Sequence, residues 1–385
     1  MKKTQTTWIY IAILSVFASS NCMGAVDGAL SKIAASLNVS NTTALYVGSI
    51  ASLSSMVSSL LIGSVLGKKL PYKTAAVCCS ITAIIGGSIP FFSRSFLFIL
   101  MTRALFGIGL GGLMSLQNPL VTRLVREEKR ASILGIGTST AFTVQCILQL
   151  IGGVLADIRW NYVFLVYLFL IIPLMIQIAK LPVIELDPVP EKQSSKSALP
   201  LNAILLCIIM GIVGLNVAPL LFGSAFYAAA INDSAAVAAV IAMMFSIGCM
   251  AGGLLFPGSY RIFKGKTLAC FLLMNAVGLL LSATADNLIV LGLGFFVTGI
   301  GNACLMAYIM MILGIICEKG QVAFASALMM AFLNLGSFIC SSWEALIGKI
   351  TGDSLYMPLY VGTGIFIIMA VMTLFWSPEK KRYIQ

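Results

Sequence analysis

Residues 96–121 read FLFILMTRALFGIGLGGLMSLQNPLV, an apolar stretch that contains one charged residue, Arg103. A helix rises 1.5 Å per residue, so about 20 apolar residues cross the hydrocarbon core of a bilayer. A strand of a transmembrane barrel would instead alternate apolar and polar residues over about ten positions. The stretch therefore predicts a transmembrane helix that carries one guanidinium at membrane depth.

The whole chain has the same character. Of its 385 residues 59% are hydrophobic and only 10% are charged, whereas soluble domains are roughly 45–50% apolar and 25% charged. The net charge of +11 comes from short basic clusters between apolar runs, which does not favour nucleic-acid binding. The ten cysteines lack zinc-like spacing and histidine is absent, so we expect no metal site, no cofactor and no enzymatic activity.

Twelve apolar runs are long enough to span a membrane, which predicts an all-α integral membrane protein. The first six lie at residues 8–30, 44–66, 74–92, 96–121, 132–156 and 162–179. The second six lie at residues 201–226, 235–256, 267–283, 288–317, 323–347 and 356–376. Between them, residues 182–200 are rich in proline and charge. We therefore expect two six-helix bundles, 1–181 and 201–385, joined by a solvated linker over 182–200.

The basic residues orient the chain. With both termini in the cytoplasm, only Lys32, Arg94, Arg159 and Lys349 of the 24 Lys and Arg residues fall in outer segments, and Arg103 lies within a span. This distribution satisfies the positive-inside rule. We expect a multi-pass protein of the cell membrane.

The two sets of six runs also share local patterns. Gly107-Ile108-Gly109 with Leu113-Met114 in the fourth run recurs 192 positions later as Gly299-Ile300-Gly301 with Leu305-Met306 in the tenth. Since both matches fall in equivalent runs of the same orientation, they indicate a parallel internal duplication.

Several motifs resemble the major facilitator superfamily of secondary transporters. Gly63 to Lys73, between spans two and three, is similar to the family's loop signature, with Gly67 in place of the usual aspartate and Leu70 in place of the second glycine. The resemblance implies a gating loop that includes the residues Gly63, Gly67, Lys68 and Lys73.

Three further motifs carry the same resemblance. Arg103 followed by Gly107 and Gly109 resembles the family's intramembrane arginine, and Asp27 resembles an acidic position at the end of span one. Gly152-Gly153 and the residues 157–164 resemble the usual start of span six. Leu148-Gln149 stands where many antiporters carry a Gly-Pro pair. The resemblance implies a twelve-helix fold built from two parallel six-helix repeats.

Arg103 and Asp27 are the first candidates for function. A guanidinium within a span costs several kcal/mol unless it is paired or hydrated, and Asp27 lies at a similar predicted height. Two roles are open for Arg103: binding an anionic group of the substrate, or pairing with Asp27 in a proton-sensing unit. We hypothesise that Asp27 binds and releases a proton as the site changes conformation. A purely structural ion pair is the alternative.

Amide side chains form the second group of candidates. Gln145 and Gln149 are four residues apart, hence on one face of span five, and are predicted to line a cavity. Asn21 and Asn302 add hydrogen-bonding groups in spans one and ten. Interhelical hydrogen bonds are the alternative for each amide. Glu344, near the outer end of span eleven, is predicted to be an interfacial, hydrated carboxylate, with a coupling site as the alternative.

These features together predict a secondary active transporter that moves a small organic solute by alternating access, coupled to protons and functional as a monomer in the lipid bilayer. No Walker-type phosphate loop is present, which disfavours ATP-driven pumping. The apolar composition favours export of amphipathic compounds. Arg103 and the missing Gly-Pro pair favour the alternative, uptake of a small organic anion. A channel or a non-transporting receptor is the alternative from another class.

Overall fold

The computed structural model describes residues 3–66, 70–184, 199–231, 234–317, 322–352 and 355–376. The predicted linker over 182–200 lies mostly outside the described residues. The helices of the N-terminal half, with 3-10 segments marked η, are α1 (Lys3–Ser20), η1 (Met23–Ala29), α2 (Leu30–Leu37), α3 (Asn41–Ala44), α4 (Tyr46–Val65), α5 (Tyr72–Ser88), η2 (Ile89–Phe92), α6 (Phe96–Leu124), α7 (Glu127–Ile158), η3 (Trp160–Leu170) and α8 (Ile171–Lys180).

The C-terminal half follows the same plan. Its helices are α9 (Leu201–Phe222), α10 (Ser224–Ala229), α11 (Ala235–Phe263), η4 (Lys264–Lys266), α12 (Thr267–Ala283), α13 (Leu288–Ile316), α14 (Val322–Thr351) and α15 (Met357–Leu374). Within the described ranges, twelve helical segments are long and apolar enough to cross a membrane. The predicted twelve-span, all-α fold in two six-helix halves is confirmed.

Spans one and seven are both interrupted, but at different depths. Span one leaves the α-helix at Asn21 and Cys22, continues as the 3-10 segment η1, and resumes as α2. Span seven has a one-residue turn at Gly223, between α9 and α10, where backbone hydrogen bonds continue across the turn. Discontinuous helices form the binding sites of many transporters, so the break in span one is a candidate position for such a site.

The two ends of the bundle differ in charge. We call the end where α4 finishes and α5 begins the basic end, because the following described cations lie there: Lys73, Arg123, Arg126, Lys129, Arg130, Lys180, Arg261, Lys264 and Lys266. We call the opposite end, which carries α2, α3 and α10, the far end. Only Lys32, Arg94, Arg159 and Lys349 among the described cations lie there.

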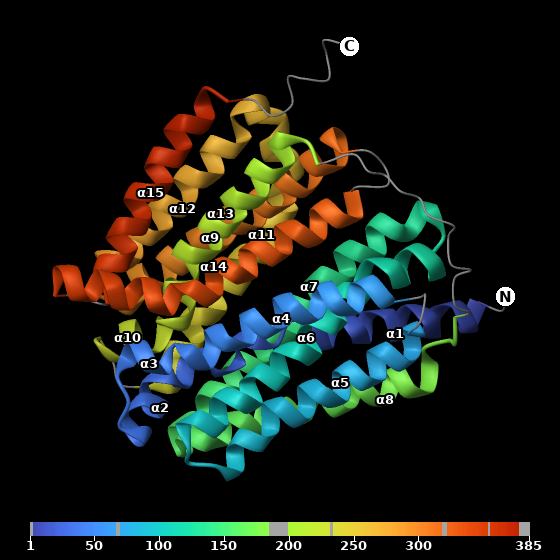
Figure 1. The fold of residues 1–385 in the computed structure, drawn as a ribbon, viewed down its shortest axis with the longest axis horizontal. Helices are drawn as coiled ribbons and strands as arrows, with labels where there is room; N and C mark the ends of the chain where they lie inside the picture. The colour runs from blue at the N-terminus through green and yellow to red at the C-terminus, as the bar shows by residue number, and fades with distance from the viewer. Residues whose placement is uncertain are drawn as a thin grey trace.

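The two halves meet at the far end. Figure 1 shows their helices side by side near α2, α3 and α10 and diverging toward the basic end. One buried apolar cluster at the far end combines residues of both halves, including Leu45 and Val47 of α3–α4 with Phe222 and Phe226 of α9–α10. A methyl group on Gly48 would lie 2.8 Å from the Phe222 ring. The far end is therefore closed by tight packing between the halves.

Toward the basic end the two halves lose these contacts. Gly135 of α7 and Gly253 of α11 are exposed, and a methyl group on either would meet no atom within 4 Å. Leu61 of α4 and Leu254 of α11 are 64% and 84% exposed. The structure thus represents one state of a two-bundle protein, closed at the far end and separated toward the basic end.

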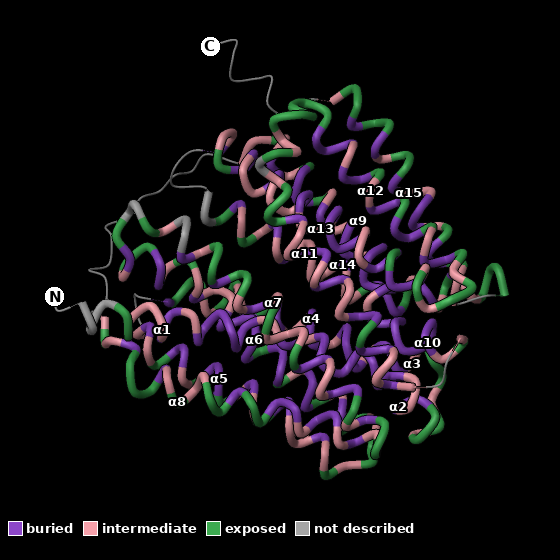
Figure 2. Tube along the Cα trace, turned by 180° about the vertical axis from the view of Figure 1, so that it is seen from behind, coloured by how far each residue is buried: buried purple, intermediate pink, exposed green. Residues whose placement is uncertain are grey.

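Helices α5, α8, α12 and α15 form the periphery of the bundle. Exposed residues are frequent along them (Figure 2), and many are large and apolar: Ile81, Ile85, Ile172, Met175, Val277, Leu280, Ile368 and Met372. Outward-facing apolar side chains on a helical membrane protein contact lipid. These helices therefore contribute much of the lipid-facing surface, and the carboxylate and amides described next lie on other spans.

Candidate functional site

A cluster of polar side chains surrounds the break in span one. A methyl group on Gly24, in η1, would lie 2.9 Å from the Nε2 atoms of both Gln145 and Gln149 and 3.1 Å from Oδ2 of Asp27. These three atoms thus border the same small space. Asp27 and Gln149 are only 5% and 3% exposed. The interruption of span one allows η1 to approach α7 closely enough to bring the carboxylate and both amides together.

Hydrogen bonds extend this cluster in two directions. The Nδ2 of Asn21, at the break itself, donates to Oε1 of Gln145 over 2.8 Å. The hydroxyl of Ser246, on α11 of the other half, donates to Oε1 of Gln149 over 3.5 Å. We call Asn21, Asp27, Gln145, Gln149 and Ser246 the polar cluster. It therefore joins both halves at the inner limit of the closed far end.

The carboxylate of Asp27 lies beside these amides but takes no part in the hydrogen bonds just described. None of the described residues donates a hydrogen bond to it, although the amide groups of Gln145 and Gln149 lie nearby. The described residues contain one ion pair, between Lys32 and Asp157. A direct Arg103–Asp27 ion pair, one of the two roles open for Arg103, is not formed in this conformation, because the guanidinium bonds to other partners, although the two charges are close enough to interact.

Arg103 is fully enclosed within the N-terminal half. Its Nε donates to the carbonyl of Val47 over 3.0 Å, its Nη1 to the Tyr167 hydroxyl over 2.8 Å, and its Nη2 to the carbonyl of Met23 over 3.4 Å. Its guanidinium also lies 4.4 Å from the centre of the Phe106 ring. Arg103 thus connects spans one, two, four and six, and its bond to Met23 holds the start of η1.

The environment of Arg103 explains why a charge is tolerated there. Three oxygen acceptors and two aromatic faces surround a side chain that is 0% exposed, and cation–π contacts strengthen when they are desolvated. Three of the five N–H groups of Arg103 have protein acceptors, and the enclosure of the side chain keeps the others out of reach of a solute in this conformation. The geometry therefore favours a positioning role for Arg103 over direct binding of a substrate anion.

The remaining sequence candidates lie elsewhere. Asn302, on α13, is half-buried, and no described hydrogen bond joins it to the polar cluster; its Oδ1 is buried without a partner. Gly63 is exposed on α4 near the basic end, and Lys73 is half-buried at the start of α5. Gly67 and Lys68 lie outside the described residues. The role of the gating loop therefore stays a prediction.

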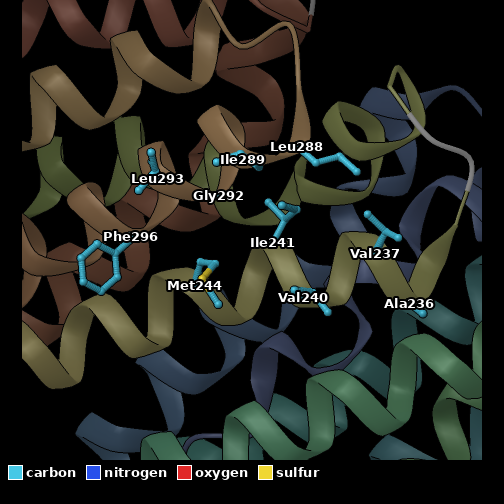
Figure 3. Close-up of a pocket in the computed structure, with 10 residues that line it drawn as sticks. All are labelled: Ala236, Val237, Val240, Ile241, Met244, Leu288, Ile289, Gly292, Leu293 and Phe296. Atoms are coloured by element: carbon cyan, nitrogen blue, oxygen red, sulfur yellow. The ribbon is translucent and has the colours of Figure 1, made fainter.

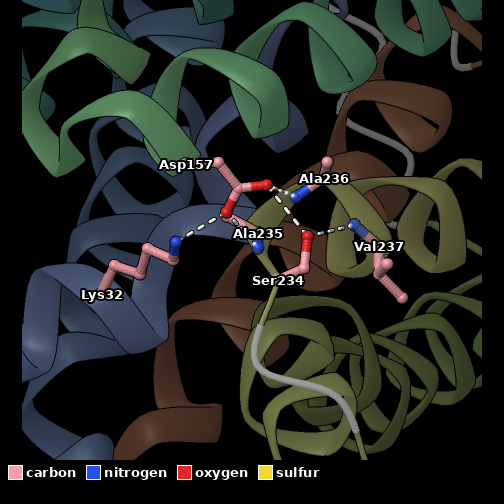
Figure 4. A network of polar contacts seen from close by, with 6 residues as sticks. All are labelled: Lys32, Asp157, Ser234, Ala235, Ala236 and Val237. Atoms are coloured by element: carbon pink, nitrogen blue, oxygen red, sulfur yellow. Dashed lines mark hydrogen bonds and ion pairs between the residues drawn. The ribbon is translucent and has the colours of Figure 1, made fainter.

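A contact that the sequence analysis missed closes the far end. Asp157, near the end of α7, accepts hydrogen bonds from the backbone N–H groups of Ala235 (2.8 Å) and Ala236 (3.0 Å) and from the Ser234 hydroxyl (2.9 Å). Lys32 of α2 lies 2.6 Å from the same carboxylate (Figure 4). A carboxylate of one half thus caps the first turn of α11 in the other half.

One large pocket is lined by apolar side chains and is therefore unsuited to a polar solute. A hollow of about 660 Å³ lies between α11 and α13 and is lined by apolar residues such as Val240, Met244, Ile289 and Phe296 (Figure 3). Ile289 is 76% exposed, so this hollow opens on the outer surface of the bundle. None of its lining residues belongs to the polar cluster.

Twelve spans in two halves, with a polar cluster at an interrupted helix where the halves meet, define the class of membrane transporters that work by alternating access. A family model described as Major Facilitator Superfamily matches residues 12–226, which is more than half of the chain. The chain belongs to the major facilitator superfamily. Its fold and family are those of transporters.

Solved structures of the same architecture match nearly the whole chain. One is a mutant form of the nucleoside transporter NupG, with 12% sequence identity, coverage of 95% of this chain and 98% of that chain, and a TM-score of 0.77. Another is the D-xylose-proton symporter, with 14% sequence identity, coverage of 98% of both chains, and a TM-score of 0.77. A bacterial homolog of the human lysosomal transporter Spinster, in an inward-facing, unoccupied conformation, matches at 13% identity, 98% of both chains and a TM-score of 0.68. A search of curated protein sequences returned no match. At these identities the similarity concerns the fold.

Proposed function

We propose that this secondary transporter moves a small, amphipathic, uncharged or cationic organic solute across the cell membrane in exchange for protons, with export as the direction. The observation that carries the proposal is the polar cluster, in which one carboxylate and two glutamines face the same space at the break of span one. Both termini are assigned to the cytoplasm and the chain is proposed to act as a monomer.

The chemistry of the cluster suits a solute with a few hydrogen-bonding groups. Gln145 and Gln149 each use their carbonyl oxygen for a protein donor, so an amide NH₂ group of each can face a ligand acceptor. Asp27 offers an acceptor for a donor group of the solute or for a proton. With Arg103 enclosed, the cluster lacks a described cation at hydrogen-bonding distance, which supports an uncharged or cationic solute over an organic anion.

Asp27 is the proposed proton-coupling residue. A buried carboxylate without a hydrogen-bond donor is costly when charged, so binding a proton or a solute donor relieves the same cost. The two events can therefore compete for Asp27, which is the requirement for exchange. One structural neighbour is a D-xylose-proton symporter, which supports proton use in this fold.

The basic end is the proposed cytoplasmic end, by the positive-inside rule. The conformation then faces the cytoplasm, since the halves are in contact at the far end and separate toward the basic end. A cytoplasmic solute would reach the polar cluster from this state. Closure of the basic end and opening of the far end would release it outside.

The proposal is tested with purified protein in liposomes under an imposed pH gradient, using a panel of amphipathic, cationic, neutral and anionic solutes. We expect gradient-driven movement of a neutral or cationic amphipathic solute. Asp27→Asn should keep solute counterflow and lose gradient-driven accumulation, whereas Gln145→Ala should weaken both. Asn334→Ala is the control, because the Asn334 amide donates to the Met330 carbonyl within its own helix. Proton-driven accumulation that persists in Asp27→Asn would overturn the coupling role, and transport of anions alone would overturn the solute class.

A further inference from the structure

Glu344 is a second carboxylate enclosed within the bundle, in the half that does not contain Asp27. It lies on α14, is 5% exposed, and its Oε1 is buried without a hydrogen-bond partner. The indole N–H of the preceding residue, Trp343, is also buried without a partner. The prediction of an interfacial, hydrated Glu344 is therefore wrong, because the neighbouring helices cover the side chain.

The helices around α14 bring no countercharge. α14 packs against α4, α9, α13 and α15 and touches α3, and none of these five helices contains an Asp, Glu, Lys or Arg residue. The nearest titratable group on α14 itself is Cys340, one turn earlier. Lys349 lies farther along α14 and is exposed.

The tyrosines and cysteines on the packed helices also have other contacts. Tyr46 shares a hydrogen bond with Ser342, and Tyr360 donates to the carbonyl of Ala283. The thiols of Cys207 and Cys304 contact the carbonyls of Ala325 and Gly252, respectively. The ring of Tyr308 lies near that of Tyr260. None of these groups can neutralise a carboxylate at Glu344. An isolated charge in a membrane span costs several kcal/mol, so a charged Glu344 is strongly disfavoured in this conformation.

The other half contributes to the enclosure of Glu344. Immediately before it in α14, Ser341 shares a hydrogen bond of 2.9 Å with Ser49, and Ser342 shares one of 2.9 Å with Tyr46. Cys340, one turn away, belongs to the apolar cluster that joins the halves at the far end. These contacts must break when the far end opens, since α4 and α14 belong to different halves. Opening therefore brings water toward Glu344.

We propose that Glu344 is a proton-binding site that links closure of the far end to the pH of the solution on that side. In the open state the carboxylate takes one proton from water, and the neutral carboxyl group is then buried when the far end closes. A charged Glu344 opposes closure, because it would be buried without a partner. Acidification at the far end thus increases the population of the closed state, independently of the solute and of Asp27.

Trp343 provides a direct reporter for this gate. The chain contains four tryptophans, so Trp8→Phe, Trp160→Phe and Trp376→Phe leave Trp343 alone. In lipid nanodiscs without solute, we expect its emission to shift to the red and its quenching by acrylamide to increase as the pH is raised. Glu344→Gln, which resembles the protonated residue in shape and charge, should abolish both changes and keep the emission of the closed state at every pH.

Further variants serve as controls. Asp286→Asn removes an exposed carboxylate at the same end and should leave the pH response intact. Glu344→Leu supplies a second neutral side chain and should match Glu344→Gln. The same pH response in Glu344→Gln as in the parent, or loss of the response in Asp27→Asn alone, would overturn the proposal. Because no solute is present, these outcomes are separate from those of the transport assay.

Discussion

The carboxylate of Asp157, in the N-terminal half, accepts a hydrogen bond of 2.8 Å from the backbone N–H of Ala235, the first residue of α11 in the C-terminal half. The first N–H groups of a helix have no partner within the helix, so a carboxylate at this place satisfies them and interacts favourably with the helix dipole. The contact exists only while the far end is closed. Asp157 therefore stabilises the closed state relative to the open one.

Asp157→Ala should shift the protein toward the state that is open at the far end. Loss of a helix cap costs about 0.5–2 kcal/mol, which changes the ratio of two states by roughly 2- to 30-fold. Spin labels at Ser36 and Ala230, exposed residues on the two halves, should report longer distances in a cysteine-free background. Lys32→Met should have a smaller effect, because an exposed ion pair contributes about 0.2–1 kcal/mol. Distances unchanged from those of an Asp286→Asn control would refute the stabilising role of Asp157.

Gly24→Ala should impair transport without unfolding the protein. The added methyl group would meet the amides of Gln145 and Gln149 at 2.9 Å, and both side chains can rotate away at the expense of their positions in the polar cluster. We expect normal expression and thermal stability with a strongly reduced transport rate. Gly253→Ala is the matched control, since a methyl group there meets no atom within 4 Å. Equal transport in the two variants would argue against a solute site around Gly24.

Tyr167→Phe tests how Arg103 is held. The substitution keeps the aromatic ring near the guanidinium but removes the hydroxyl that accepts the 2.8 Å bond from Nη1. A buried donor that loses its partner costs about 1–3 kcal/mol, so we expect a lower thermal unfolding temperature in detergent. Arg103→Lys should be destabilised further, because a single ammonium cannot reach all three acceptors. If Arg103→Lys retained full stability and lost only transport, Arg103 would instead contact the solute.

The sequence predicted the spans well because their signal is local. About 20 apolar residues in a row indicate a transmembrane helix whatever its neighbours are. The break at Asn21 and Cys22 has no such signal, because the small residues beside it, Ser19, Ser20 and Gly24, also occur within continuous transmembrane helices. It depends on tertiary contacts, among them the bond from Arg103 to the Met23 carbonyl. The sequence therefore indicated where span one lies but not that it is interrupted.

For the candidate residues, too, the sequence predicted local properties but not contacts between spans. Gln145 and Gln149 were predicted to share a face from their spacing, which is a property of one helix, and the structure places them beside Asp27. The partners of Arg103 and of Asp157 lie on other spans, so their spacing in the sequence carries no information about the contacts. Glu344 was misjudged for the same reason, because its burial depends on the packing of other helices around α14.

The repeated Gly-x-Gly pattern leads to a prediction about both halves at once. A methyl group on Gly107 would lie 2.2 Å from the carbonyl oxygen of Ala51 in span two, and one on Gly299 would lie 2.2 Å from that of Phe245 in span eight. These equivalent close approaches involve backbone atoms, which cannot move aside as a side chain can. Gly107→Ala and Gly299→Ala should each destabilise the protein by about 1–3 kcal/mol or more through overpacking.

Thermal unfolding in detergent would measure this effect, with Gly135→Ala as the control at an open position of span five. We expect both variants to unfold at lower temperature than the control, by similar amounts, because the two contacts are equivalent in the duplicated fold. Destabilisation by only one of them would mean that the halves pack their fourth spans differently, and that the recurrence of the motif after 192 positions reflects composition rather than shared packing.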